Sequence, residues 1–214
     1  MKILILFLIL LSGSIYCQNS VQLGTQIWMT ENLGVTQFQN GDPIPQAQTD
    51  DEWQEAGFNG KPAWCYVTVA NEEGVKQELK QYGKMYNSYA INDPRGIIPE
   101  GWRISTTVDW GNLEAYVSTS NSKLTDLISV KDWDTLGGTN KTGLNIEPAG
   151  WRDVGCGGVG GSVTYWCEAI IDPTADETTT NTLSVVQYED GSIGFQYGET
   201  SWIMGHYVRC VKLD

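Results

Sequence analysis

Cysteine is the residue type in this chain that points most directly to chemistry, and five cysteines are present. Cys17 lies in an apolar leader that is treated below, which leaves Cys65, Cys156, Cys167 and Cys210 in the body of the chain. No two of these have the C-x-x-C spacing of a zinc site, and an even number in an exported chain is typical of disulfides. Four cysteines allow three pairings. The short spacing of Cys156 and Cys167, which a hairpin can span, favours the disulfides Cys156–Cys167 and Cys65–Cys210.

Hydrolytic and metal chemistry have weaker signals. His206 is the only histidine, and no other metal-ligating residue lies at a useful spacing from it. The runs Asp50-Asp51-Glu52 and Asp172-x-x-x-Asp176-Glu177 supply hard oxygen ligands for calcium. Such runs are more often solvated acidic loops. We therefore expect no catalytic residue, no metal ion and no cofactor.

Tryptophan is the residue type that bears most directly on binding. Four of the nine tryptophans lie in polar or glycine-rich surroundings, namely Trp53, Trp133, Trp151 and Trp202. An exposed indole offers a flat face to a sugar ring or an apolar anchor to a protein partner. The alternative is that these side chains fold back to cover an edge of the core.

The composition limits the class of protein and of partner. The chain has 214 residues, of which 41% are hydrophobic, so it can form one domain with a substantial core. An aromatic content of 11% argues against disorder. The formal net charge of −13 excludes a binder of nucleic-acid phosphates and disfavours an anionic membrane surface. A neutral or basic partner is expected.

The first seventeen residues are typical of an export signal. Lys2 precedes the apolar run 3–11, which ends at Ser12-Gly13-Ser14 and is too short to span a hydrocarbon core of about 30 Å. We expect residues 1–17 to be a signal peptide and residues 18–214 to form a single secreted or cell-surface domain without a membrane span. Cleavage after Ser14 is the alternative, and it fits the small-residue rule better, because Ile15 and Tyr16 before Cys17 are not small. Lipid anchoring through Cys17 is disfavoured, because Tyr16 before it is bulky.

Two short helices are expected, followed by a strand-rich second half. The first spans residues 84–91 and stops before Pro94, because a residue that precedes proline disfavours the α conformation. The second begins at Thr106 or Thr107, where a hydroxyl can cap the N-terminus and Asp109 lies in the first turn. The spacing of Trp110, Leu113 and Val117 then gives this helix one apolar face.

The strands expected from composition and turn signals span residues 26–29, 63–69, 144–151, 164–170, 183–188, 193–197 and 207–213. Glu189-Asp190-Gly191 indicates a hairpin turn between two of them. The polar segment 174–182 is expected to be a surface loop, and residues 30–60 are expected to be irregular. The pattern predicts an α+β domain with a mostly antiparallel sheet and long loops.

A spaced series of short motifs runs from Gln26 to the C-terminus. It reads Gln26-Ile27-Trp28-Met29-x-x-Asn32-Leu33, Tyr82-Gly83-x-x-Tyr86-Asn87, Pro99-x-Gly101-Trp102, Thr106-x-x-x-Trp110-x-x-Leu113, Gly143-Leu144-Asn145, Pro148-Ala149-Gly150-x-Arg152, Tyr165-Trp166 and Val208-Arg209-Cys210-Val211. Each motif alone is weak, but in this order they resemble the Fibrobacter succinogenes major paralogous domain family. Two positions depart from the family pattern. Ile98 takes a cysteine position, and Ser105-Thr106 stands where the family usually has Pro-Thr.

The resemblance implies a secreted or surface bacterial protein with a C-type-lectin-like fold and no established biochemical activity. The usual calcium-dependent sugar motifs of that fold are missing, since Ala149 follows Glu147-Pro148 and no Trp-Asn-Asp occurs. We expect a non-catalytic binding or adhesion module for an extracellular protein or glycan. Its site is expected in the second half, at Trp133 and Trp151 first, with Trp53 and Trp202 next.

An enzyme is the alternative function. The closing Val-Arg-Cys-Val strand is also similar to the end of formylglycine-generating and sulfatase-modifying domains, which share the C-type-lectin-like fold. Such an enzyme would need reactive or metal-binding cysteines in an open groove, and Cys156 and Cys167 are the only pair close in sequence.

Overall fold

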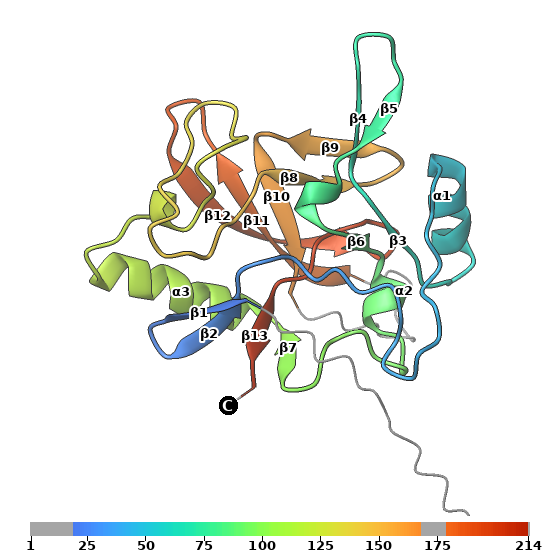
Figure 1. Cartoon of the computed structure of the whole chain (residues 1–214), viewed down its shortest axis with the longest axis horizontal. Helices are drawn as coiled ribbons and strands as arrows, with labels where there is room; N and C mark the ends of the chain where they lie inside the picture. Colours follow the sequence, from blue (N-terminus) through green and yellow to red (C-terminus); the bar gives the residue numbers. More distant parts are fainter. Residues whose placement is uncertain (1–18, 168–178, 214) are drawn as a thin grey trace, which may run out of the picture.

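The computed structural model describes residues 19–167 and 179–213 and confirms the α+β class (Figure 1). A four-stranded antiparallel sheet, in the order β1-β2-β13-β7, brings the two ends of the described chain together. Its strands are β1 (Ser20–Leu23), β2 (Gln26–Met29), β13 (Cys210–Lys212) and β7 (Trp102–Ile104). Trp28 of β2 pairs with Val21 on one side and with Val211 on the other.

A second, five-stranded sheet has the order β12-β11-β10-β8-β9. Its strands are β8 (Ala149–Arg152), β9 (Cys156–Val159), β10 (Ser162–Trp166), β11 (Thr179–Gln187) and β12 (Ile193–Ser201). Only the β8–β10 pair among these is parallel. The turn expected at residues 189–191 joins β11 to β12, and Gly191 adopts φ +80° there. Most of the expected loop at 174–182 lies outside the described residues, but Thr179 to Thr182 belong to β11.

The helix expected near Thr106 is α3 (Thr107–Thr119). Thr106 is its N-cap and forms a capping box with Asp109, so the start signal in the sequence was correct. Ser105, which departs from the family pattern, accepts a hydrogen bond from Trp110 Nε1 at 2.9 Å. The Ser105 hydroxyl therefore holds the indole of Trp110, the tryptophan of this helix, in place.

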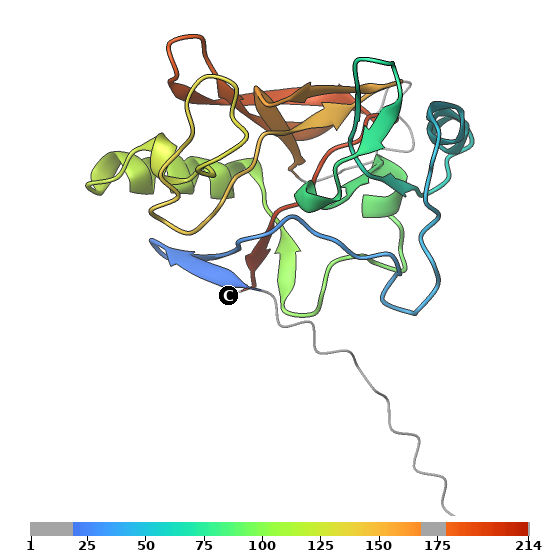
Figure 2. The ribbon, with the colours of Figure 1, turned by 45° about the horizontal axis from the view of Figure 1, so that its top comes forward.

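α3 lies between the two sheets (Figure 2). Its expected apolar face is buried, with Trp110, Leu113 and Val117 each exposing 4% or less of their surface. The Trp110 ring centroid lies 4.7 Å from that of Trp28 in the four-stranded sheet and 5.2 Å from that of Tyr165 in the five-stranded sheet. One tryptophan thus connects the three layers.

The N-terminal half differs from the expectation in two places. Helix α1 (Asp50–Phe58) lies in a segment expected to be irregular, and a capping box between Thr49 and Glu52 begins it. The expected helix 84–91 is reduced to α2 (Ser88–Ile91), which Asn87 caps. Met85 and Tyr86, just before Asn87, form a strand instead. With α1 added, the described part of the structure has three α-helices rather than the two expected.

Two small antiparallel ribbons complete the fold. The first pairs β3 (Trp64–Cys65) with β6 (Met85–Tyr86), and the second pairs β4 (Thr68–Ala70) with β5 (Lys76–Glu78). Two short 3₁₀ helices span Lys80–Tyr82 and Leu124–Asp126. Within residues 19–167 and 179–213, no helix is long and apolar enough to cross a membrane.

Within residues 19–167 and 179–213, Cys65, Cys156, Cys167 and Cys210 are not joined to one another in disulfides, so neither expected disulfide is present. β8 lies between β9, which carries Cys156, and β10, which precedes Cys167. Cys65 and Cys210 belong to two different buried apolar clusters. The short spacing of Cys156 and Cys167 suggested a hairpin between them. In the sheet, however, β8 lies between β9 and β10 and separates the two cysteines. Cys17 and the expected signal peptide lie outside the described residues.

Candidate functional site

Two neighbouring residues of β8 serve two different pockets. Trp151 and Arg152 are adjacent in the strand, so their side chains leave the sheet on opposite faces. Trp151 lines a shallow pocket over β10, β11 and β12, which we call the Trp151 pocket. Arg152 lines a second pocket between α1 and the β4–β5 ribbon, which we call the Arg152 pocket.

The Trp151 pocket has a volume of about 290 Å³ and a floor rich in hydroxyl groups. Strand register explains the composition, because Thr164, Ser184 and Gln196 lie side by side on β10, β11 and β12. Alternation along a strand brings Thr182 and Thr200 to the same face. The residues that line the pocket include no lysine or arginine, and Glu199 is the one acidic residue among them. The pocket is therefore polar and nearly uncharged.

Trp151 supplies the aromatic surface of this pocket. Its ring lies against the backbone of β9, since a Cβ atom at Gly157 would come within 3.1 Å of the ring and one at Gly158 within 2.9 Å. Glycine at these two positions leaves the room that the ring occupies. The residue stays half-buried, and the indole N–H has no hydrogen-bond partner among the described residues. An apolar face and a free donor are available to a ligand.

His206 closes one end of the pocket and is 3% exposed. Burial lowers its pKa to about 3, so the ring is neutral at physiological pH. Nε2 lies 3.4 Å from Thr200 Oγ1, and Nδ1 has no hydrogen-bond partner among residues 19–167 and 179–213. A neutral imidazole with a low pKa is a poor general base near pH 7, which argues for a structural or binding role.

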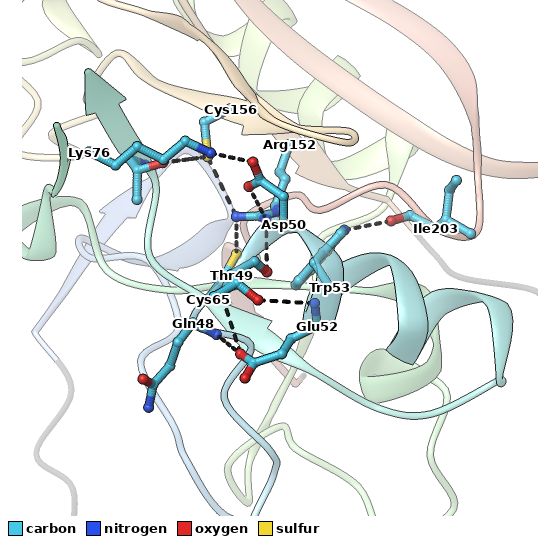
Figure 3. Close-up of polar contacts among 11 residues, drawn as sticks. Gln48, Thr49, Asp50, Glu52, Trp53, Cys65, Lys76, Arg152, Cys156 and Ile203 are labelled. Carbon is cyan, nitrogen blue, oxygen red and sulfur yellow. Dashed lines mark hydrogen bonds and ion pairs between the residues drawn. The ribbon is translucent and has the colours of Figure 1, made fainter. Parts of the chain in front are cut away.

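The Arg152 pocket has a volume of about 520 Å³ and a mixed charge (Figure 3). Arg152 is 3% exposed, and its Nη2 donates to Asp50 Oδ1 at 2.7 Å. Lys76 of β5 forms an ion pair with the same carboxylate. The hydrogen bond from Lys76 and the nearby guanidinium lower the pKa of Asp50. The capping box of α1 positions Asp50, because it fixes where the first turn of the helix begins.

Two thiols lie against the same guanidinium. Cys65 Sγ and Cys156 Sγ are each 3.8 Å from Arg152 Nη1 and lie on either side of it (Figure 3). The backbone N–H of Thr68 also donates to Cys156 Sγ, at 3.3 Å. Cys65 is 1% exposed, and burial raises its pKa to about 12. In the part of the chain that the structure describes, Arg152 Nε has no hydrogen-bond partner, so the guanidinium is incompletely paired there although it is buried.

The structure separates the four candidate tryptophans. Trp53 and Trp133 are 1% and 7% exposed, and their indole N–H groups donate to Ile203 O and Ser129 Oγ at 2.9 and 3.1 Å. These two side chains cover the core, which is the alternative that the sequence left open. Trp202 is half-buried and makes an edge contact with Tyr89 at 5.3 Å. Of four pockets compared among the described residues, one is lined by Trp151 and none by Trp53, Trp133 or Trp202.

Apart from Trp151 and the acidic pair Asp50 and Asp51, sequence reasoning did not propose the residues of the two pockets as ligand residues. Arg152 was noted only as part of a family motif, and His206 only as a lone histidine. Hydroxyl and apolar residues alternate at residues 182–185, and this pattern, which the sequence analysis did not use, is the signal that could have indicated a strand with one polar face. The acidic run at residues 50–52 is the capped first turn of α1. Within the described residues no group of three histidine, cysteine or acidic side chains could hold a metal ion.

Comparison with known proteins gives one match. The family model described as the Fibrobacter succinogenes major domain matches residues 21–212, which is most of the chain. No curated protein and no solved structure matches it.

Proposed function

The chain belongs to the Fibrobacter succinogenes major domain family, and we propose that it is a non-catalytic binding module for a neutral saccharide. In this proposal the domain has a C-type-lectin-like fold and binds its ligand in the Trp151 pocket. Its setting is the cell surface or the extracellular space, after removal of residues 1–17. Anchoring through Cys17 is the alternative form of attachment.

One observation carries the proposal, namely a half-buried indole beside a row of hydroxyl groups. A pyranose ring has an apolar face of C–H groups, which packs against an aromatic ring, and a rim of hydroxyls, which exchange hydrogen bonds with polar side chains. Trp151 provides the first surface, and Thr182, Ser184 and Gln196 provide the second. A volume of about 290 Å³ lies at the lower end of ligand pockets and suits one sugar unit of a longer chain.

The charge of the pocket supports a neutral ligand. No basic side chain lines it, so an anionic sugar or a phosphate would meet no counter-charge there. The formal net charge of −13 further disfavours acidic ligands. Neither the lack of a basic side chain in the pocket nor the negative net charge of the protein opposes the binding of a neutral saccharide. Its binding is expected to change little with salt, because screening acts on charge pairs.

A glycan array tests the ligand class directly. Residues 18–214 should retain neutral saccharides in preference to sulfated, phosphorylated or sialylated ones. An array that returns only anionic glycans, or no glycan at all, would contradict the proposal.

Substitution of Trp151 tests the site with the best saccharide from the array. Trp151→Ala should weaken binding at least about tenfold, which corresponds to about 1.4 kcal/mol in isothermal titration calorimetry. Trp202→Ala is the matched control, because Trp202 is also half-buried but lines none of the described pockets. Circular dichroism should show both variants folded. Wild-type affinity in a folded Trp151→Ala protein would place the site elsewhere.

A further inference from the structure

A pair of cysteines on two distant segments meets at one arginine, and the binding proposal makes no use of it. Cys65 lies on β3 and Cys156 on β9, and Nη1 of Arg152 is 3.8 Å from both sulfur atoms. The spacing in the sequence did not predict that Cys65 and Cys156 would lie together. The arrangement gives the two sulfurs different environments, and that difference defines a direction of reaction.

Three hydrogen-bond donors surround the sulfur of Cys156. Its sulfur is approached by the backbone N–H of Thr68 at 3.3 Å, by the Thr68 hydroxyl at 3.6 Å and by Arg152 Nη1 at 3.8 Å. All of these groups can donate to sulfur, and their contacts hold the Cys156 side chain in one place beside Arg152. Cys156 is also only half-buried, so a reagent in solution can reach it.

Cys65 has the opposite character. It is 1% exposed, and burial keeps it in the protonated form. The nearby Asp50 carboxylate adds to this effect, whereas the Arg152 guanidinium opposes it. A buried thiol of this kind does not react first with a reagent in solution. It can react second, once the neighbouring sulfur has become an electrophile.

We propose that Cys156 and Cys65 form a redox-active pair, in which Cys156 attacks a small disulfide and Cys65 resolves the product into an intramolecular disulfide beside Arg152. The substrate class is a low-molecular-weight disulfide such as oxidised glutathione. The Arg152 guanidinium contacts both sulfur atoms, so it fixes the side chains of Cys156 and Cys65 on the same group. Because the same positive charge repels metal cations from both sulfurs, a metal thiolate site is disfavoured there.

The reaction balances in two exchange steps. The Cys156 thiolate attacks one sulfur of the small disulfide, the S–S bond breaks, and one small thiolate leaves. Cys65 Sγ then attacks Cys156 Sγ in the mixed disulfide, and the second small thiolate leaves and takes up the proton from Cys65. Two protein thiols are oxidised, and one small disulfide is reduced to two thiols.

Thiol labelling of the reduced full chain tests which cysteine reacts first. The chain should carry Cys17→Ser, so that only the four described cysteines react. A short exposure to iodoacetamide, followed by peptide mapping, should label Cys156 at least about tenfold faster than Cys167 or Cys210, which are fully buried. Labelling of Cys156 no faster than these two would overturn the proposal.

Incubation of the same chain with oxidised glutathione tests the pair. Non-reducing peptide mapping should find Cys65 joined to Cys156. In the Cys65→Ser variant the reaction should end with glutathione joined to Cys156 in a mixed disulfide. The Cys156→Ser variant should form neither this mixed disulfide nor a disulfide at Cys65. Cys210→Ala is the matched control and should still form the Cys65–Cys156 disulfide. A disulfide between any other two cysteines, or a mixed disulfide that persists in the parent chain, would overturn the proposal.

Discussion

Arg209 shows, at the scale of one residue, how a motif of this family can be structural. Its side chain is fully buried, yet four oxygen atoms surround the guanidinium. Nη1 donates to the carbonyls of Met29 and Leu144 at 3.1 and 3.0 Å, and Nη2 donates to Asn32 Oδ1 and to the Tyr165 hydroxyl at 2.8 and 3.2 Å. The residue therefore connects the beginning, the middle and the end of the chain.

Replacement of Arg209 by methionine should be strongly destabilising. The change keeps an unbranched side chain but leaves two buried carbonyl groups without donors, at about 1–3 kcal/mol each. We expect the free energy of unfolding in urea to fall by about 3 kcal/mol. Arg95→Met is the control, because Arg95 forms ion pairs with Asp42 and Asp93 near the surface, where such pairs contribute about 1 kcal/mol or less. Equal losses in both variants would contradict this view of Arg209.

At the scale of the element, α3 is the part of the fold that sequence reasoning described best. Its capping residues and its buried face were both correct, since they depend on residues within one or two helical turns of each other. The hairpin turn at residues 189–191 was correct for the same reason.

A pair of substitutions on α3 tests that face. Trp110→Ala should lower the free energy of unfolding by about 3–5 kcal/mol, because Trp110 is fully buried among aromatic rings of both sheets. Val108→Ala on the same helix should change it by no more than about 0.5 kcal/mol, since Val108 is 69% exposed. Urea unfolding of both variants gives the comparison. A small loss for Trp110→Ala would mean that the helix is docked differently.

The elements that were missed have few local signals. α1 buries only Trp53 and Gly57, so it has no apolar stripe, and the capping pair Thr49 and Glu52 was its one signature in the sequence. Residues 84–87 contain apolar positions that suit a helix, but pairing with β3 makes Met85 and Tyr86 a strand. Secondary structure that depends on a distant partner cannot be read from a local pattern.

The two pockets lay beyond sequence reasoning for a similar reason. Both depend on β8 lying between β9 and β10, which places a parallel contact within a run of antiparallel ones. That order separates Cys156 from Cys167 and brings Cys156 to Arg152. It also aligns hydroxyl side chains from β10, β11 and β12 beneath Trp151. Of the residues that line the Trp151 pocket, the sequence analysis proposed Trp151 as a ligand residue and none of the others.

At the scale of the whole molecule, acid stability should depend on the buried histidine. The folded state excludes the proton that His206 binds in the unfolded state between pH 6.5 and about 3. Because the unfolded state then binds more protons, the free energy of unfolding falls as the pH is lowered through this range, by up to about 1.4 kcal/mol per pH unit.

Urea unfolding at pH 7 and pH 5 measures this effect. The loss of stability between the two should be larger in the wild type than in His206→Gln, which has no imidazole to protonate. Burial raises the pKa of Glu147, so this residue acts with the opposite sign in part of the range, but it is present in both proteins and cancels in the comparison. The carboxyl groups with lowered pKa values, such as Asp50 and Asp109, lose their stabilising effect near and below the ordinary pKa of 3.8, which is below the pH 5 of this experiment. Identical losses would mean that His206 is protonated in the folded state.

The position of β2 between β1 and β13 has a consequence for chain connectivity (Figure 1). Val21 and Val211 flank Trp28, so they are two strand spacings, or about 10 Å, apart. A linker of a few residues can bridge that distance. New ends can then be opened at Gly74, in the exposed turn between β4 and β5, where an added Cβ atom would have no other atom within 4 Å. A circular permutant joined and opened in this way should keep every strand pairing of both large sheets, which would mean that the order in which the ribosome delivers the strands does not define this fold.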